Sequence, residues 1–341
     1  PPAPPPQAAP APTELPESVR LAVRAANRAL GRTTWRADLA LLGLLDEFRS
    51  LETVPALIAQ LEYFFAHLDE VKSGKLSGLA VYQAHELLVS MTGAVFPADQ
   101  PEKWRAFWEA EKDKIAVTEK RNPAAAGAPT TVAGGFCGIP VQGTRVVFVV
   151  DLSGSMDWPM ADDGPDGKKK KMIRLDFAKR ELKRAMDLIS PNAQFNLITF
   201  NGNPKAESWK PAMVQATPAN REAFKKYVDG LRADGGTNVW SGLEDALKIK
   251  SVVFGNRYTT NIDELFVLSD GAPTVGDVQD PVEILRLVQE CNKFANVRIN
   301  TIFISSETPE EYRNREPKMK ITPQELMRRM AQENGGKFRE L

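Results

Sequence analysis

The sequence is poor in the residues on which many catalytic and redox sites depend. Its 341 residues include two cysteines, too few for a disulfide framework. The two histidines, His67 and His85, both precede residue 121, so no Ser-His-Asp or Cys-His site can form within residues 121–341. A phosphate-binding loop of the form G-x-x-x-x-G-K-[ST] is also absent. These absences point away from the common hydrolase and nucleotide-hydrolysing sites.

An excess of charge of one sign and long apolar runs are missing as well. Lysine and arginine number 44, and aspartate and glutamate also number 44, which gives no bulk attraction to nucleic acid or an anionic membrane. No apolar run approaches the roughly 20 residues that span a bilayer. We therefore expect neither a nucleic-acid partner nor a membrane-spanning segment.

Because the sequence begins at Pro1 rather than Met, we interpret it as a mature form or a fragment, in which any signal peptide would be invisible.

The N-terminal third has two compositions. Residues 1–16 are almost entirely proline and alanine, which predicts a stiff, extended linker. Residues 17–118 carry apolar residues at helical spacing, as between Leu57 and Leu68, and predict a smaller all-α domain. Two such helices joined by a short turn resemble a HEAT-type repeat unit, and a small helical bundle is the alternative because no second unit recurs. Residues 119–139 are predicted to form a linker and entry segment.

Residues 140–341 alternate between strand and helix patterns. This alternation predicts an α/β domain with a doubly wound, mainly parallel, Rossmann-like sheet flanked by helices. In such sheets ligands bind beyond the carboxyl ends of the strands. The predicted strands cover residues 146–150, 194–200, 264–269, 297–304 and 337–341, with a short one near 208–214; the predicted helices cover 172–189, 218–230, 239–249 and 281–294, with a last helix beginning after Thr322.

Three polar loops stand at the ends of these elements. Asp151, Ser153 and Ser155 follow the first apolar strand, and a glycine between the serines permits a tight turn. Thr237 lies in a glycine-rich loop that leads into a helix, and Asp270 ends a second apolar strand. Carboxylate and hydroxyl oxygens are hard ligands that suit Mg²⁺ or Mn²⁺ rather than zinc or copper.

The D-x-S-x-S motif, the later threonine and the later aspartate together resemble a von Willebrand factor type A (vWA) domain with a metal-ion-dependent adhesion site. The resemblance covers about residues 140–341. It implies that Ser153 and Ser155 bind the ion through their hydroxyls, and that Asp151 and Asp270 bind directly or through water. Thr237 would bind directly only when its loop moves in. A partner's Asp or Glu carboxylate would then complete the coordination shell.

The segment from Asp157 to Lys171 leaves the same strand end as the serines. Its run of charges favours a solvated loop. The sharper hypothesis is that Trp158, together with Trp240 near the Thr237 loop, forms an aromatic rim for the partner. The lysines of this segment could also attract an acidic ligand.

The two cysteines have different settings. Cys291 lies on an apolar helical stripe, which predicts a buried core thiol. Cys137 lies in a glycine-rich entry segment, Phe136 to Pro140, and the sequence assigns it no role.

Helical segments followed by such an entry and a vWA domain resemble proteins predicted from bacterial genomes, many of them exported. This resemblance and the Pro/Ala-rich start favour an extracytoplasmic, exported protein. No residue here requires export, so the cellular location stays unassigned.

We expect a non-enzymatic, metal-dependent protein-binding module with an adhesion-type site. The alternative is an accessory vWA subunit that docks on an ATP-driven machine of the MoxR or chelatase type. A hydrolase that uses a metal-bound water is disfavoured because residues 121–341 lack histidine and an evident general base.

Overall fold

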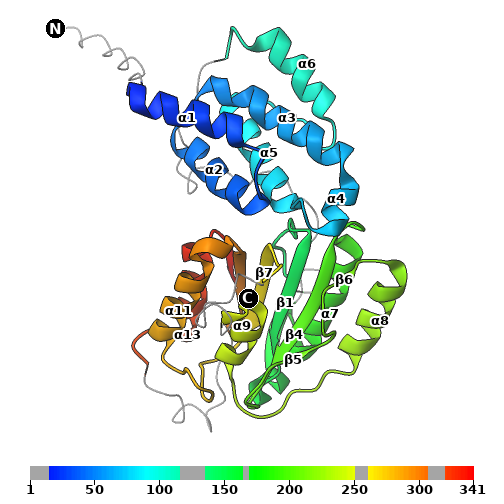
Figure 1. The fold of residues 1–341 in the computed structure, drawn as a ribbon. Coiled ribbons are helices and arrows are strands. Elements are labelled where there is room, and N and C mark those ends of the chain that lie inside the picture. Colours follow the sequence, from blue (N-terminus) through cyan, green and yellow to red (C-terminus); the bar gives the residue numbers. More distant parts are fainter. Residues whose placement is uncertain (1–14, 116–134, 164–168, 250–259, 306–318) are drawn as a thin grey trace, which may run out of the picture. The chain divides into compact units, whose positions relative to one another are not determined.

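The computed structural model describes residues 15–115, 135–163, 169–249, 260–305 and 319–341 (Figure 1). The chain divides into two compact units. The first comprises Pro1–Phe65 and Gln83–Ala125, and the second comprises Ala66–Tyr82 and Ala126–Leu341. The domain boundaries expected from the sequence remain a prediction.

The first unit is all-helical, as predicted (Figure 1). Its fully buried side chains include Leu57 and Leu61 of the predicted apolar stripe and Trp104. The side chain of Thr34 accepts a hydrogen bond from the amide of Ala37, which caps the second helix. Its elements are α1 (Glu17–Ala29), α2 (Trp35–Glu47), a short 3-10 turn (Leu51–Thr53), α3 (Val54–Ala66), α5 (Gly78–Thr92), whose first residues belong to the second unit, and α6 (Pro101–Glu111).

His85 has a structural role in this unit. Its Nε2 donates to the carbonyl oxygen of Phe96 at 2.7 Å. Its ring also packs edge-on against Trp104, with the centroids 5.7 Å apart. The HEAT-like character of the unit stays a prediction.

The second unit is built on a seven-stranded sheet with the order β5-β4-β1-β7-β8-β9, and β6 pairs with β4. β4, β1, β7, β8 and β9 run parallel, while β5 and β6 pair antiparallel to β4. The mainly parallel sheet confirms the predicted fold class. The strands are β1 (Arg145–Asp151), β4 (Gln194–Phe200), β5 (Glu207–Ser208), β6 (Val214–Gln215), β7 (Glu264–Ser269), β8 (Arg298–Phe303) and β9 (Phe338–Glu340).

Helices cover both faces of this sheet (Figure 1). Val146, Phe148 and Val150 of β1 pack in one apolar cluster with α7 and α8, while Val147 and Val149 pack in the other with α9, α11 and α13. Strand side chains alternate between faces, so an uninterrupted apolar strand supplies both clusters. Cys291 is buried in the second cluster, which confirms its predicted core role. The helices are α7 (Arg174–Leu188), α8 (Pro218–Asp229), α9 (Val239–Leu247), α11 (Pro281–Ala295) and α13 (Pro323–Glu333).

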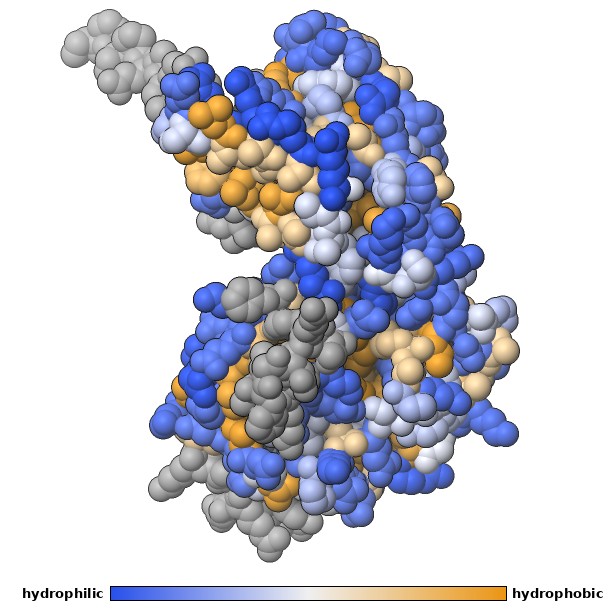
Figure 2. All heavy atoms as spheres, viewed as in Figure 1, coloured by the Kyte–Doolittle hydropathy of each residue, from blue (hydrophilic) through white to orange (hydrophobic). Residues whose placement is uncertain are grey.

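The surface over these elements is mostly hydrophilic in the view of Figure 2, with apolar residues scattered among polar ones. This distribution is expected where the apolar side chains of a sheet and its helices are already packed against one another. Cys137 also belongs to the interior: it is 3% exposed and lies in the same cluster as α7 and α8.

The segment expected as a solvated loop contains a hairpin instead. β2 (Pro159–Asp163) pairs antiparallel with β3 (Lys169–Ile173), and α7 begins at Arg174 rather than at residue 172. Met160 is buried in the core and faces Met172 across the hairpin, which packs against the same cluster. These two apolar side chains anchor the base of the hairpin. Residues 164–168, in the middle of the predicted loop, lie outside the described residues.

A buried polar network lies at the amino ends of β1 and β7. Asp263 is fully buried, and its carboxylate accepts hydrogen bonds from the amides of Thr144 and Arg145 at 3.0 and 2.8 Å. It also accepts from the hydroxyl of Ser77 at 2.6 Å. Ser77 follows α4 (Leu68–Ser73), so this carboxylate binds the segment Ala66–Tyr82 to the sheet within the second unit.

Candidate metal centre

Asp151 is the last residue of β1 and is fully buried at the carboxyl end of the sheet. Its Oδ1 accepts a hydrogen bond from the amide of Ser153 at 2.8 Å. Its Oδ2 accepts from the hydroxyl of Ser269 at 2.6 Å. Sequence reasoning missed Ser269, although a hydroxyl next to Asp270 in an otherwise apolar strand was an available signal. Together these bonds hold the Asp151 carboxylate against the turn that carries the two motif serines.

The two serines of the motif lie side by side. Ser153 Oγ and Ser155 Oγ are 3.1 Å apart. Ser155 lies in a short 3-10 helix, η2 (Gly154–Asp157). Its hydroxyl donates a hydrogen bond to Asp270 Oδ1 at 2.9 Å. The hydroxyls therefore join the loop after β1 to the loop after β7.

The Thr237 loop packs against both neighbours. The amide of Gly154 donates to the carbonyl oxygen of Gly235 at 2.9 Å. Gly235 adopts a φ of 75°, a left-handed conformation that favours glycine. The amide of Thr237 donates to Thr274 Oγ1 at 2.9 Å, and the Thr237 side chain is 5% exposed. The loop thus approaches the serine turn on one side and the segment after β7 on the other.

Gly271 marks the point where the three loops meet. A Cβ placed on this glycine would lie 3.7 Å from Thr237 Oγ1 and 4.0 Å from Ser155 Oγ. The structure therefore gathers all five predicted side chains at one edge of the sheet. Asn238, beside Thr237, accepts from the amide of Ser241 and caps α9, as expected of a turn residue.

Arg174 is the residue of this site that sequence reasoning missed most clearly. Its Nη1 lies 2.5 Å from Asp270 Oδ2, and the two side chains are 2% and 0% exposed. Its guanidinium also lies 5.1 Å from the ring centroid of Trp158. Arg174 is separated from Asp270 by 96 positions, and the sequence offers no local signal that pairs them.

The pKa values of the two carboxyl groups, Asp151 and Asp270, are both raised. Burial, followed by the nearby Asp270 carboxylate, raises the pKa of Asp151 to about 7. Burial also raises the pKa of Asp270, against the opposing effect of Arg174. Each pKa is raised because the charged form loses water and, for Asp151, meets a like charge. A bound cation would favour the ionised forms of both groups.

The two tryptophans expected to form a rim have different positions. Trp240 is 6% exposed and packs in the core with the apolar side chains of α9, β1 and β4, so it offers no rim. The reason is its place on α9, whose inner face covers the sheet. Trp158 is half-buried and lies at the start of the hairpin, beside Arg174.

The donor set fits a hard divalent cation. It combines two carboxylates with three hydroxyls, and all are oxygen donors of the type that Mg²⁺ and Mn²⁺ prefer. Among the described residues, no group of three or more His, Cys, Asp or Glu side chains is placed to hold a metal.

Comparisons with known proteins identify the family of the sheet unit. A family model described as the von Willebrand factor type A domain matches residues 146–338. Inter alpha-trypsin inhibitor heavy chain 4 of Mus musculus is 33% identical over 154 residues, which cover 45% of this chain and 14% of that protein. Inter-alpha-trypsin inhibitor heavy chain H1 of Bos taurus is 33% identical over 148 residues, which cover 43% and 14%. The chain therefore spans a small part of the length of these relatives.

Two solved structures are also similar. A von Willebrand factor type A protein from Catenulispora acidiphila aligns with a TM-score of 0.40 and 20% identity, over 58% of this chain and 38% of that one. Proximal thread matrix protein 1 from the mussel byssus, with a zinc-occupied MIDAS motif, aligns with a TM-score of 0.35 and 16% identity, over 57% of this chain and 41% of that one.

Within the described residues, every helix is too short or too polar to cross a membrane.

Proposed function

Because this chain belongs to the von Willebrand factor type A family, whose domains are in general binding modules, we propose that it binds a protein partner through a divalent cation. Sites of this kind in the family hold divalent cations, and Mg²⁺ or Mn²⁺ is the proposed ion. Asp151, Ser153, Ser155, Thr237 and Asp270 would hold it. The bound ion would supply an electrophilic centre to which an Asp or Glu carboxylate of the partner could bind.

The observation that supports this proposal most strongly is the grouping of the oxygen donors at the carboxyl end of the sheet, where Ser155 contacts both Ser153 and Asp270 and lies near Thr237. Three hydroxyls can each turn a lone pair toward a cation, since a hydroxyl is both donor and acceptor. The two carboxylates supply the negative charge, and Arg174 already offsets part of that charge at Asp270. A site with limited net negative charge leaves the ion attractive to a further carboxylate.

The partner surface that we propose includes Trp158 but excludes Trp240. Trp158 is partly exposed and lies beside the ion pair of Arg174 with Asp270. An aromatic side chain at this position offers contact area with little loss of conformational entropy. We propose no catalytic role, because residues 121–341 lack histidine and the site carboxylates are assigned to the ion.

Calorimetric titration of Mg²⁺ and Mn²⁺ into the chain tests the metal site directly. We expect saturable binding that Asp151→Ala abolishes. Asp277→Ala is the matched control, since Asp277 is an exposed carboxylate seven positions after Asp270. Equal binding by the Asp151 variant and the parent chain would contradict the proposed site.

A second measurement tests the open coordination position. Water proton relaxation reports on water bound to Mn²⁺, and acetate serves as the carboxylate probe. We expect acetate to lower the relaxation enhancement of the Mn²⁺-loaded chain but not that of free Mn²⁺ at the same concentration. A relaxation enhancement that acetate leaves unchanged would mean that the ion offers no position to a partner carboxylate.

A further inference from the structure

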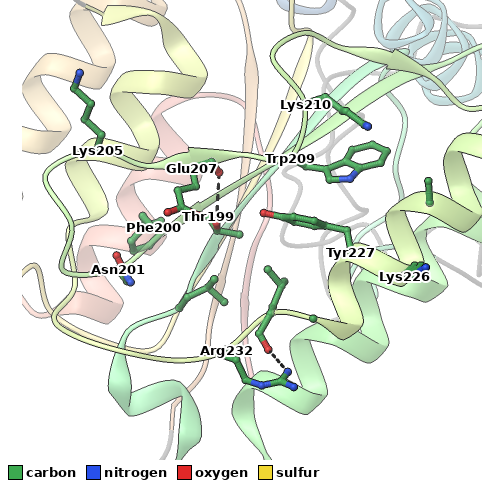
Figure 3. A pocket seen from close by; sticks show the side chains of 14 residues that line it. Thr199, Phe200, Asn201, Lys205, Glu207, Trp209, Lys210, Lys226, Tyr227 and Arg232 are labelled. Carbon is green, nitrogen blue, oxygen red and sulfur yellow. Dashed lines mark hydrogen bonds between the residues drawn. The ribbon is translucent and has the colours of Figure 1, made fainter.

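A pocket with a volume of about 630 Å³ lies where β4 and β5 meet α8 (Figure 3). This volume falls within the range of roughly 300–1,000 Å³ that is usual for small-molecule sites. None of its lining residues belongs to the five proposed metal ligands. The pocket is therefore distinct from the candidate metal centre.

Aromatic side chains form one wall of the pocket. Trp209 stacks on Phe195 with the centroids 5.5 Å apart and meets Phe224 edge-on at 5.2 Å, so the core holds its ring in place. Tyr227 lies next to it, with a centroid distance of 6.4 Å. Figure 3 shows the two rings on the same side of the pocket. A fixed aromatic wall of this kind favours an apolar, ring-sized body.

The Tyr227 hydroxyl adds a polar group to that wall. It forms a hydrogen bond with Thr199, and burial raises its pKa above the ordinary value. The phenol therefore stays protonated at neutral pH. In Figure 3 the hydroxyl points toward Thr199 and Glu207, across the pocket from α8.

The charge around the pocket is predominantly positive. Lys205, Lys210, Lys226 and Arg232 line it, and Glu207 is the one carboxylate among its described lining residues. Within the described part of the chain, no ion pair joins any of these three lysines to a carboxylate.

The neighbouring Lys225 shows the opposite behaviour. It pairs with Asp187 at 2.7 Å and with Glu222 at 3.2 Å, and it does not line the pocket. Lys226, the next residue on the same helix, lines the pocket and forms no such pair with any described carboxylate.

Two other cations of the lining have neutral partners: Lys210 Nζ lies 5.1 Å from the centroid of the Trp209 ring, and Arg232 donates to backbone carbonyl oxygens. These contacts leave the positive charges of the lining uncompensated by a carboxylate among the described residues.

We propose that this pocket binds a small organic anion that carries a phosphate or carboxylate group on a ring-sized apolar body. The anion pairs with Lys210 and Lys226, and the ring lies against Trp209 and Tyr227. Charge-assisted hydrogen bonds supply most of the affinity, and the aromatic wall supplies selectivity for a ring. The site needs no metal.

Calorimetric titration of the full chain with phenyl phosphate, in the presence of chelator, tests this proposal. We expect saturable binding that is unchanged in Asp151→Ala. Lys226→Gln should weaken it severalfold, and the double variant Lys210→Gln/Lys226→Gln should weaken it by about tenfold or more. Lys225→Gln removes the same charge from the adjacent position and should leave the affinity unchanged. Phenylacetate in place of phenyl phosphate then identifies the preferred anion.

Several results would overturn the proposal. If binding does not saturate at millimolar phenyl phosphate, the pocket is not a site for this anion. Equal weakening by Lys225→Gln would reduce the effect to general surface charge. If inorganic phosphate binds as tightly as phenyl phosphate, the aromatic wall contributes nothing to affinity. If benzyl alcohol binds as tightly, the cations contribute nothing. Because chelator is present throughout, none of these results depends on the metal centre.

Discussion

A buried pair of carboxylates lies at each end of the neighbouring strands β1 and β7, and the two pairs are bonded in different ways. At the amino end, Asp263 and Glu264 accept hydrogen bonds mainly from backbone amides. At the carboxyl end, Asp151 and Asp270 meet hydroxyls, one amide and one arginine. Burial is nearly complete at both ends, so burial does not separate a structural pair from a candidate metal pair.

The share of fixed amide donors is larger at the amino end, where Asp263 also accepts from the hydroxyls of Ser77 and Thr144. A backbone amide can only donate, and it is fixed by the chain, so the amides that hold Asp263 and Glu264 have no lone pair to offer to a cation. A serine or threonine hydroxyl can rotate and present a lone pair instead. The amides at the amino end therefore hold one bonding pattern, whereas the hydroxyls at the carboxyl end can exchange protein contacts for an ion. Substitutions at the two ends and changes of pH should therefore affect stability and Mg²⁺ binding differently.

Asp263→Ala should be the most destabilising change. It leaves the amides of Thr144 and Arg145 and the hydroxyl of Ser77 without their acceptor in a buried site. We expect a loss of about 3–5 kcal/mol in the free energy of unfolding, measured by urea denaturation with and without Mg²⁺. Mg²⁺ should not restore this loss. A loss below about 1 kcal/mol would show that the amide network is not what stabilises this end.

Arg174→Met should destabilise the metal-free chain by about 2–3 kcal/mol, because it leaves the buried Asp270 carboxylate without its cation. In contrast to Asp263→Ala, this loss should be recovered when Mg²⁺ is added. Removal of the arginine charge should also tighten Mg²⁺ binding by about tenfold. Calorimetry and thermal unfolding measure the two effects. Weaker Mg²⁺ binding in this variant would mean that Arg174 supports the ion rather than opposing it.

The stability of the metal-free chain should fall as the pH rises. The folded pKa of Asp151 is about 7 and its ordinary value is 3.8, so between these values the folded chain keeps a proton that the unfolded chain releases. The loss should amount to a few kcal/mol at most and should level off above about pH 7. Saturating Mg²⁺ should remove this part of the slope, since the ion binds the ionised form.

Glu264 gives this measurement an internal comparison. Burial raises its pKa too, so it contributes a slope of the same sign. In Asp151→Asn we expect a smaller slope, to which Glu264 and Asp270 still contribute. Mg²⁺ should no longer change it, because this variant lacks one of the proposed carboxylate ligands. Denaturant unfolding at a series of pH values provides the data. An unchanged slope in Asp151→Asn would be inconsistent with the raised pKa.

Ser77→Ala should have the smallest effect. It removes one hydrogen bond to Asp263, while the amides of Thr144 and Arg145 still hold the carboxylate. We expect a loss of about 1 kcal/mol, with Mg²⁺ affinity unchanged. Thermal unfolding and calorimetry check both statements, and a change in Mg²⁺ affinity would indicate that the two ends of the sheet are coupled.

Much of the sheet unit could be predicted from the sequence. Uninterrupted apolar runs marked the strands, and capping residues such as Asp280 and Thr322 marked helix starts that the structure contains. The parallel order then followed from the alternation of strand and helix. The hairpin β2–β3 was missed because its charged sequence hides a single cross-strand pair of methionines, Met160 and Met172.

The chemistry of the candidate site can be read from the chain alone, because the oxygen donors each stand at a strand or loop end: Asp151, Ser153, Ser155, Thr237 and Asp270. The neighbours of these donors depend on the tertiary structure. Arg174 reaches Asp270, Ser269 reaches Asp151, and Trp240 turns into the core. The physical reason is that a strand or helix pattern depends on residues a few positions apart, whereas an ion pair across 96 positions depends on how the elements pack.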